Sequence, residues 1–337
     1  MADKTVIEWT DATWNPITGC AKVSQGCKNC YAERTWERLS ANPKTVYFER
    51  AFTDVRCHPE HLDQPLRWSK PRRIFVNSMS DLFHPDVPFQ FIADVFAVMS
   101  CTTRHTYQVL TKRPGRMLEF FSWLTFEEYP FFGWPDQVQA TKVWPSWQPY
   151  REGKQGGYDN CGPSWPLVNV WLGVSVEDQA TADERIPMLL QTPATVRWVS
   201  AEPLLGPICL YDWIGPWGSP GELQAPAMLD WVVAGGESGP KARPMHPGSA
   251  RSLRDQCAAA GVPFLFKQWG EWGPTEVKVG GDLGGDMRRG TSIIMHAPGN
   301  PEGHFSRGDA MMSRIGKKRA GRLLDGVQHD GYPEAKR

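Results

Sequence analysis

Three of the eight cysteines of this 337-residue chain lie within one short stretch, at Cys20, Cys27 and Cys30. Thiolates this close together in a sequence normally hold a metal. Zinc in a structural site prefers four protein ligands, whereas an iron-sulfur cluster takes one thiolate for each bound iron. A four-iron cluster on three protein thiolates keeps one iron open, and S-adenosylmethionine (SAM) is a molecule that uses such an opening for radical chemistry. The ligand count therefore points to a 4Fe-4S cluster with SAM.

Zinc is the alternative occupant of the cysteine stretch. A structural zinc site needs a fourth ligand, and the nearest candidates in the sequence are Cys57, His58 and His61. Such a site predicts a non-catalytic, zinc-stabilised module that binds nucleic acid or a protein. Disulfides are not expected, because nothing at the N-terminus resembles a signal peptide and a cytoplasmic chain keeps its thiols reduced.

Short apolar runs predict a series of strands. They lie at residues 74–77, 107–110, 168–176, 195–199, 229–233 and 263–266, with a first strand within residues 6–18. Composition and periodicity predict helices at residues 31–40, 87–100 and 249–260, the last one capped by Ser249. Strands that alternate with helices indicate a parallel sheet, so the predicted fold is α/β, a partial or complete (β/α) barrel.

Polar residues follow most of these apolar runs. In a β/α barrel the carboxyl ends of the strands converge on one face, where barrel active sites are built. The polar residues at these ends include Asn77, Asp81, Thr111, Lys112, Ser175, Glu177, Glu202, Glu237 and Lys267. The cysteine stretch follows the first strand and is expected on the same face. Any single carboxylate in the set has a plain structural explanation, as a loop cap or as an ion-pair partner.

Several segments depart from the alternating pattern. Residues 181–191 have a helical composition, but Pro187 predicts a break there. Residues 119–166 carry five tryptophans and predict an insertion, either a lid or a surface excursion packed by its own aromatic side chains. Residues 275–312 are rich in glycine and predict a loop. We therefore divide the chain into a barrel with its insertion at 1–275 and a C-terminal extension with a basic segment, packed on the barrel, at 276–337.

Charge and hydropathy restrict the classes of partner. The 37 basic residues balance the 37 acidic ones, so nucleic-acid binding has to come from a local patch. The basic clusters are Lys317, Lys318, Arg319 and Arg322, and also Lys70, Arg72, Arg73, Lys112, Arg113 and Arg116. Solvated helix faces explain each cluster equally well. No apolar run of about 18 residues occurs, so no membrane span is predicted.

Six motifs resemble those of one known family. They are WNPITGC at residues 14–20, GCKNCYAE at 26–33, VWLGVSVE at 170–177, VSAEPL at 199–204, AGGESG at 234–239 and GRLLDG at 321–326. Together they are similar to a phage-associated, radical-SAM-like family of largely undefined function, over nearly the whole chain. The common radical SAM spacing is Cys-x3-Cys-x2-Cys, whereas six residues separate Cys20 from Cys27 here.

The resemblance implies a radical SAM enzyme that uses an electron donor such as flavodoxin or ferredoxin. Its cluster would sit on the three cysteines, and its catalytic residues would be Glu202, Glu237 and Lys267. The cofactor contacts would be Tyr31, Asn77, Ser78, Ser80, Asp81, Thr111, Lys112, Ser175 and Glu177. Among these, the loop after the second predicted strand would hold the amino group of the methionine part of SAM, and Tyr31 would contact the adenine. The phage association implies a DNA base, such as a hypermodified thymine, or a nucleotide as the substrate, in the cytoplasm of a host bacterium.

Overall fold

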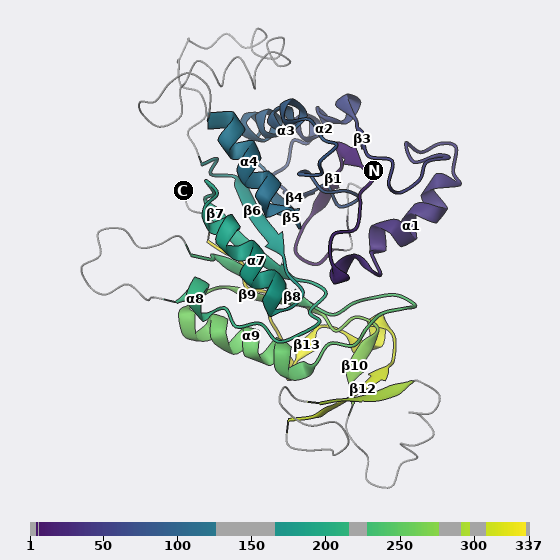
Figure 1. The fold of residues 1–337 in the computed structure, drawn as a ribbon, viewed down its shortest axis with the longest axis vertical. Coiled ribbons are helices and arrows are strands. Elements are labelled where there is room, and N and C mark those ends of the chain that lie inside the picture. The colour runs from purple at the N-terminus through teal and green to yellow at the C-terminus, as the bar shows by residue number, and fades with distance from the viewer. Residues whose placement is uncertain are drawn as a thin grey trace, which may run out of the picture.

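The computed structural model describes residues 5, 7–125, 166–215, 228–275, 291–296 and 308–334. Its centre is a seven-stranded sheet in the order β1-β4-β5-β6-β7-β8-β9, and all neighbouring strands are parallel. The strands are β1 Ala12–Trp14, β4 Arg73–Val76, β5 Thr106–Thr111, β6 Val170–Ser175, β7 Val196–Ala201, β8 Trp231–Gly235 and β9 Phe264–Gln268. The sheet curls into a half-barrel, in which β1 and β9 form the two open edges (Figure 1). The predicted α/β partial barrel is confirmed.

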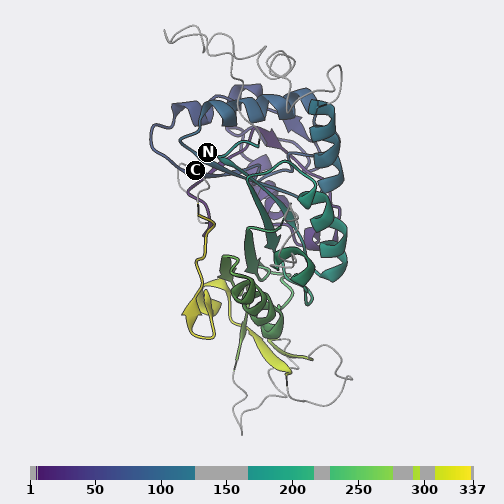
Figure 2. The same cartoon turned by 90° about the vertical axis from the view of Figure 1, so that its left-hand side faces the viewer.

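Helices cover the outer side of the half-barrel (Figures 1 and 2). They are α3 Phe89–Cys101, α4 Pro114–Thr125, α7 Gln179–Leu190 and α9 Pro247–Ala260. The shorter helices are α2 Gln64–Arg67, α8 Tyr211–Ile214 and α11 Lys317–Ala320, with single 3-10 turns η1 Gln25–Cys27 and η2 Pro59–His61. Helix α1 Tyr31–Ser40 packs separately, with Trp36 buried against Tyr47 and Phe52. The first turn of α1, directly after the cysteine stretch, lies beside the carboxyl ends of the strands.

The two faces of the sheet bury different side chains. The outer face carries mainly aliphatic and phenylalanine side chains, which pack against the covering helices. The inner face carries an aromatic cluster that includes Trp9, Phe75, Trp171, Trp198 and Trp231. The ring centroids of Trp9 and Phe75 lie 4.7 Å apart, and those of Trp9 and Trp198 lie 5.3 Å apart. The concave side of the half-barrel is therefore lined with rings below its carboxyl-end rim.

Short antiparallel sheets complete the described chain. Strands β10 Trp272–Pro274, β11 Ser292–Met295 and β12 Ala310–Arg314 form a three-stranded sheet in the order β10-β12-β11. Strand β2 Ile17–Thr18 pairs with β3 Arg56–Cys57, and β13 Leu323–Leu324 pairs with β14 Val327–Gln328. The chain then returns to the half-barrel, where Trp231 donates its indole N–H to the carbonyl of Gly331 at 2.7 Å.

Three local predictions were wrong. Helix α7 continues through Pro187. The proline removes the usual hydrogen bond to the carbonyl of Asp183, and the helix tolerates this because both residues lie on its exposed side. Helix α9 is capped by the ring of His246, which accepts the N–H of Gly248, and Ser249 lies inside the helix. The described part of residues 275–312 contributes strands β11 and β12 to a sheet.

The predicted insertion begins later than residue 119. Residues 119–125 complete helix α4, and Trp123 packs on Phe89 and Phe120 in the core. The other four tryptophans of the insertion lie outside the described residues, so its role stays a prediction. Within the described segments, none of the helices has the length and apolar character needed to cross a membrane.

Candidate functional site

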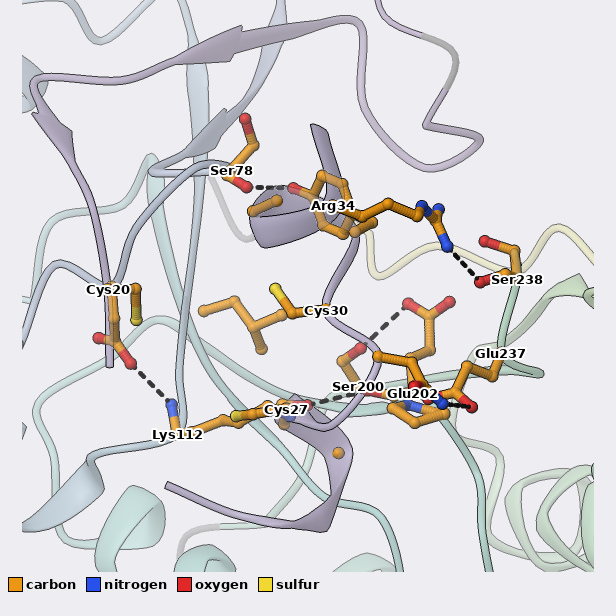
Figure 3. A pocket seen from close by; sticks show the side chains of 18 of the residues that line it. Cys20, Cys27, Cys30, Arg34, Ser78, Lys112, Ser200, Glu202, Glu237 and Ser238 are labelled. Carbon is orange, nitrogen blue, oxygen red and sulfur yellow. Dashed lines mark hydrogen bonds between the residues drawn. The ribbon is translucent and has the colours of Figure 1, made fainter. Parts of the chain in front are cut away.

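A cavity of about 620 Å³ opens at the carboxyl ends of the parallel strands, between the half-barrel and the cysteine stretch (Figure 3). Cys20, Cys27 and Cys30 all line it. The other predicted site residues that line it are Tyr31, Asn77, Ser78, Ser80, Asp81, Thr111, Lys112, Ser175, Glu202, Glu237 and Lys267. Glu177 lies beneath the lining and is buried. Side chains from six strand ends and from the first loop therefore meet in one place.

The cysteine loop, residues 19–30, begins at a glycine. Gly19 has a φ of +93°, and a side chain there would place its Cβ 2.9 Å from the carbonyl carbon of Asp54. Gly19 also pairs with Ser80 in a parallel bridge, which ties the loop to the segment after β4. Helix α1 begins directly after Cys30. Both ends of the loop are thus fixed by regular backbone structure.

A first charge pair holds the start of the cysteine loop. Asp81 accepts the hydroxyl of Thr111 at 2.7 Å and pairs with the Arg113 guanidinium at 3.1 Å. Arg113 also donates to the carbonyl of Ala21 at 2.9 Å and lies 3.8 Å from the sulfur of Cys20. The ends of β4 and β5 therefore reach the loop through an arginine whose charge Asp81 balances.

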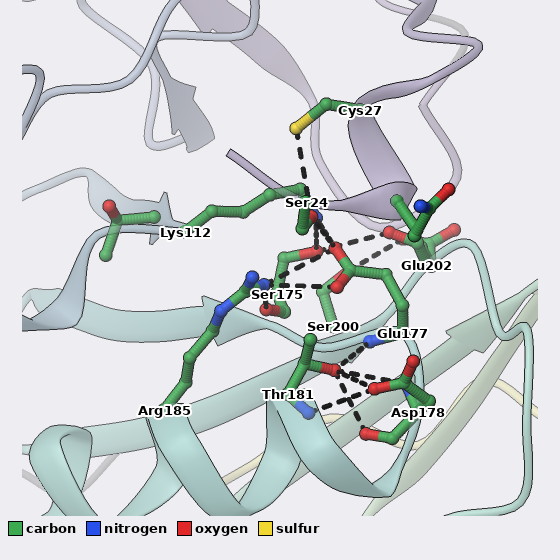
Figure 4. Close-up of polar contacts among 12 residues, drawn as sticks. Ser24, Cys27, Lys112, Ser175, Glu177, Asp178, Thr181, Arg185, Ser200 and Glu202 are labelled. Atoms are coloured by element: carbon green, nitrogen blue, oxygen red, sulfur yellow. Dashed lines mark hydrogen bonds and ion pairs between the residues drawn. The ribbon is translucent and has the colours of Figure 1, made fainter. Parts of the chain in front are cut away.

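A second charge group lies under the middle of the loop (Figure 4). The buried Glu177 carboxylate binds Lys112 Nζ at 2.5 Å and Arg185 at 3.3 Å. It also accepts the hydroxyl of Ser24 at 2.9 Å, and that hydroxyl lies 3.9 Å from the Cys27 sulfur. Gly26 passes directly over Glu177, since a Cβ on Gly26 would lie 2.6 Å from the carboxyl carbon. The loop backbone therefore lies so close to Glu177 that only a glycine fits at position 26.

A third charge pair holds the end of the loop. Glu237 accepts the side-chain amide of Asn29 at 2.9 Å and pairs with Arg243 at 2.6 Å. Arg243 also donates to the carbonyl of Gln25 at 2.9 Å. Burial alone would raise the pKa of the Glu237 carboxyl, but the hydrogen bonds from Arg243 and Asn29 bring that pKa below its usual value. Glu237 is therefore an ionised anchor of the loop in this structure.

The segment after β4 braces the same loop from the other side. Ser78 donates to the side chain of Asn15, and Ser80 donates to the carbonyl of Ile17 at 2.9 Å. The Tyr31 hydroxyl donates to the carbonyl of Ser78. Asn77 has a φ of +61°, and its buried side-chain N–H₂ has no partner among the described residues. A strained backbone with an unsatisfied buried donor is a feature that recurs at functional sites.

The opposite wall of the cavity is aromatic below and charged above. Trp9, Phe75 and Leu110 line it at the level of the inner aromatic cluster. Above them Lys267 pairs with Glu202 at 3.0 Å, and its ammonium lies 5.9 Å from the centroid of a Trp9 ring. Glu202 also accepts the Ser200 hydroxyl at 3.1 Å. This pair contacts no residue of the cysteine loop through a hydrogen bond in the described structure.

Burial raises the pKa values of two of the three loop thiols, and the candidate fourth zinc ligands lie outside the cavity lining. Burial first, and then the nearby Asp81, raises the pKa of Cys20 to about 11, and burial also raises the pKa of Cys30. Across the described residues, the group whose ligand atoms lie within 4.8 Å of one another is His58, Glu60 and His61, and it contains no cysteine. None of Cys57, His58 and His61, the candidate fourth zinc ligands, lines the cavity.

Several site residues could not be identified from the sequence. Asn29, Arg185 and Arg243 bind the predicted carboxylates, and Arg113 is predicted only as a member of a basic cluster. Arg34 lines the cavity and donates to the carbonyl of Ser238 at 2.9 Å. The one local signal is Gly26, since a glycine next to a predicted metal ligand indicates close backbone approach. The arginines carry no such signal, because their partners lie far away in the sequence.

Most residues of the predicted basic clusters bind other residues of the same chain. Arg73 pairs with Asp11 at 3.1 Å, Arg116 donates to the carbonyl of Val87 at 2.9 Å, and Arg322 donates to the carbonyl of Lys267 at 2.9 Å. Lys317 pairs with Glu8 at 3.6 Å, but it also lines the cavity and begins the exposed turn α11. The basic turn Lys317–Ala320 therefore lies at the mouth of the site.

Comparison with known proteins gives a family but no activity. The family described as a protein of unknown function (DUF5131) matches residues 4–333. The chain belongs to the DUF5131 family. No curated protein and no solved structure matched it. The description of the DUF5131 family names no radical SAM chemistry and no phage origin, so both stay predictions from the sequence motifs.

Proposed function

We propose that this DUF5131 protein is a radical SAM enzyme. The observation that carries the proposal is the convergence of the three loop cysteines with the polar ends of β4, β5, β6, β7, β8 and β9 on one cavity. In parallel α/β folds this edge of the sheet is where substrates and cofactors bind. The cavity volume of about 620 Å³ falls within the range typical of small-molecule and cofactor sites.

The donor set of the cavity fits a 4Fe-4S cluster better than zinc. Three soft sulfur donors line the cavity, and no histidine does among the described residues. The thiols with raised pKa values would release their protons on binding iron, as metal ligands generally do. Such a cluster, held by three thiolates, would leave one iron without a protein ligand and would supply the electron for reductive cleavage of SAM bound there through its methionine end.

The protein side chains would bind and orient SAM around that position. Asn77, which the resemblance assigns to the methionine amino group, offers a buried amide donor without a partner, and a donor suits the methionine carboxylate instead. Ser78 and Ser80 hold the adjoining backbone in place, and Tyr31 covers it through its bond to Ser78. Glu237, which the sequence suggested as a catalytic group, is proposed here to position the cysteine loop instead. Glu202 and Lys267 stay as the candidates for proton transfer to or from a substrate.

The substrate is proposed to be a nucleic-acid base or a group attached to it. Trp9 and Phe75 give the cavity an aromatic wall against which a planar ring can pack. The turn at Lys317–Ala320 places basic side chains at the mouth, where they can contact backbone phosphates. A base inside such a cavity has to leave the stack, as bases do in other enzymes that modify them.

Anaerobic reconstitution with iron and sulfide tests the cluster. We expect about four irons per chain in the parent protein. Changing Cys20, Cys27 and Cys30 together to Ala should abolish iron binding and the visible absorbance. Changing the exposed Cys101 and Cys209 to Ala should leave both unchanged. About one iron or less per parent chain, or stoichiometric zinc that persists under anaerobic preparation, would sink the proposal in favour of the zinc-stabilised module.

Nucleoside mass spectrometry tests the substrate. The reconstituted protein is incubated anaerobically with SAM, a reductant and phage or host DNA, and the DNA is digested to nucleosides. We expect loss of one modified nucleoside and the appearance of an isomeric or lighter one, together with 5′-deoxyadenosine. Formation of 5′-deoxyadenosine without any nucleoside change would show that the substrate is another molecule.

A further inference from the structure

Lys112, Glu177 and Arg185 form a charged group directly behind the cysteine loop, in which Glu177 and Arg185 are buried and Lys112 lines the cavity (Figure 4). Their side chains are 19%, 1% and 3% exposed, respectively. Lys112 also donates to the hydroxyl of Ser175, and Arg185 donates to the carbonyl of Ser175 at 2.7 Å. The three side chains are thus fixed to the end of β6 as well as to one another.

This group differs in charge from the two other groups that hold the loop. Asp81 with Arg113, and Glu237 with Arg243, are each one carboxylate against one guanidinium. At Glu177 a single carboxylate faces two cations, so the group carries a net positive charge. Ser24 connects it to Cys27, because the Ser24 hydroxyl lies 2.9 Å from Glu177 and 3.9 Å from the Cys27 sulfur.

An excess charge that is largely shielded from water acts strongly on its surroundings. The energy between two charges rises as the effective dielectric constant falls, so a fixed cation inside a protein matters more than one in water. The reduction potential of an iron-sulfur cluster depends on the charges and hydrogen bonds around its sulfurs. A nearby positive charge stabilises the more negative, reduced form of a cluster.

Resting on the proposed function, we propose that the Lys112–Glu177–Arg185 group is a positioning and charge-tuning element for the cluster. Glu177 sets the place of residues Ser24–Cys27, and the excess positive charge makes the cluster easier to reduce. The electron comes from an external one-electron donor of the flavodoxin or ferredoxin class. It adds one negative charge to the cluster, and no bond in the protein is formed or broken in that step.

Potentiometric titration of the reconstituted protein, followed by electron paramagnetic resonance, tests the inference. Lys112→Met removes a positive charge and should shift the reduction potential to lower values. Glu177→Gln removes the negative charge while keeping an oxygen for Ser24, and it should shift the potential to higher values. Lys112→Arg keeps the charge and should leave the potential near that of the parent. A purely structural role predicts shifts in one common direction, or none.

Removal of a distant charge provides the control. Arg251 binds Asp325 on the surface, and Arg251→Met should leave the potential unchanged. A cluster that forms in the parent but shows the same potential in Lys112→Met and Glu177→Gln overturns this inference and leaves the proposed function standing. A parent that forms no cluster overturns both. If Lys112→Met does not fold, the upward shift in Glu177→Gln alone decides.

Discussion

The two walls of the cavity hold their charges in different ways. On the cysteine-loop wall, Glu177 is 1% exposed and is bound by two cations and a loop serine. On the opposite wall, Glu202 and Lys267 are 14% and 19% exposed and bind mainly each other above an aromatic floor. The first arrangement fixes a piece of backbone, and the second can exchange its partners with a ligand. Positioning and reaction are therefore proposed to belong to opposite walls.

The largest difference between the walls is expected in stability. Glu177→Ala would leave Arg185, whose side chain is 3% exposed, buried without its carboxylate, which typically costs about 3–5 kcal/mol of unfolding free energy. Glu202→Ala on the other wall should cost less, roughly 1.5 kcal/mol, because Lys267 can turn toward water in the cavity. Urea denaturation of both variants measures the two values. Equal losses would remove the distinction between the walls.

The sequence predicted the strands and the face on which they gather polar groups. Apolar runs that end in polar residues are a local signal, and this signal alone identified Asn77, Thr111, Ser175, Glu202 and Lys267 as neighbours. The helix at residues 31–40 was predicted with the bounds that α1 has. Both successes follow from patterns a few residues long, which the parallel fold then brings together.

What the sequence could not provide were the partners of these groups. Arg243 lies beside Gln25 and Arg113 beside Ala21, although about 220 and 90 residues separate them along the chain. No local pattern encodes such contacts. Helix α7 shows the same limit, since Pro187 is tolerated only because that side of the helix faces solvent in the folded protein. The roles of the carboxylates depend on such non-local pairing.

A smaller loss of unfolding free energy is expected from a change at Gly26, where the loop contacts Glu177. Gly26→Ala would place a methyl group 2.6 Å from the Glu177 carboxyl carbon, and neither side can move freely. Overpacking of this kind costs about 1–3 kcal/mol, and the displaced loop should also bind less iron. Gly115→Ala is the matched control. Gly115 lies in helix α4, and a methyl group on it would meet only the Met188 sulfur, at 3.8 Å. Gly115→Ala should therefore raise the free energy of unfolding by about 0.4–1 kcal/mol.

The mouth of the cavity offers a test of the nucleic-acid proposal. Lys318→Ala combined with Arg319→Ala removes two exposed cations of α11 and keeps Lys317, which lines the cavity. Each phosphate contact adds about 0.9 to the slope of log affinity against log salt. Losing two contacts should therefore shrink the loss of DNA affinity between about 50 and 200 mM salt by roughly tenfold. Fluorescence anisotropy with labelled duplex measures both slopes.

The control for that test removes two cations elsewhere. Arg251→Ala combined with Arg254→Ala takes the same charge from helix α9, away from the cavity lining. This variant should keep the salt dependence of the parent. If the two double variants behave alike, α11 is a solvated surface, and the basic turn has no part in binding the substrate.

The smallest effect is expected at a charged cluster outside both walls, and it tests whether burial is what gives the cysteine-loop wall its strength. Arg251, and then Arg254, lower the pKa of Asp325 from 3.8 to about 2. A carboxyl whose pKa is lowered by folding stabilises the folded protein at pH values above its ordinary pKa of 3.8. This stability is lost as the pH falls toward 2. The Asp325 side chain is 36% exposed, so solvent screening keeps the contribution below about 1 kcal/mol. Asp325→Asn should therefore be slightly less stable than the parent at pH 7, and the difference should shrink between about pH 4 and pH 3 and at high salt. Urea denaturation at these pH values measures it, and a loss as large as that of Glu177→Ala would show that exposure does not separate the two kinds of site.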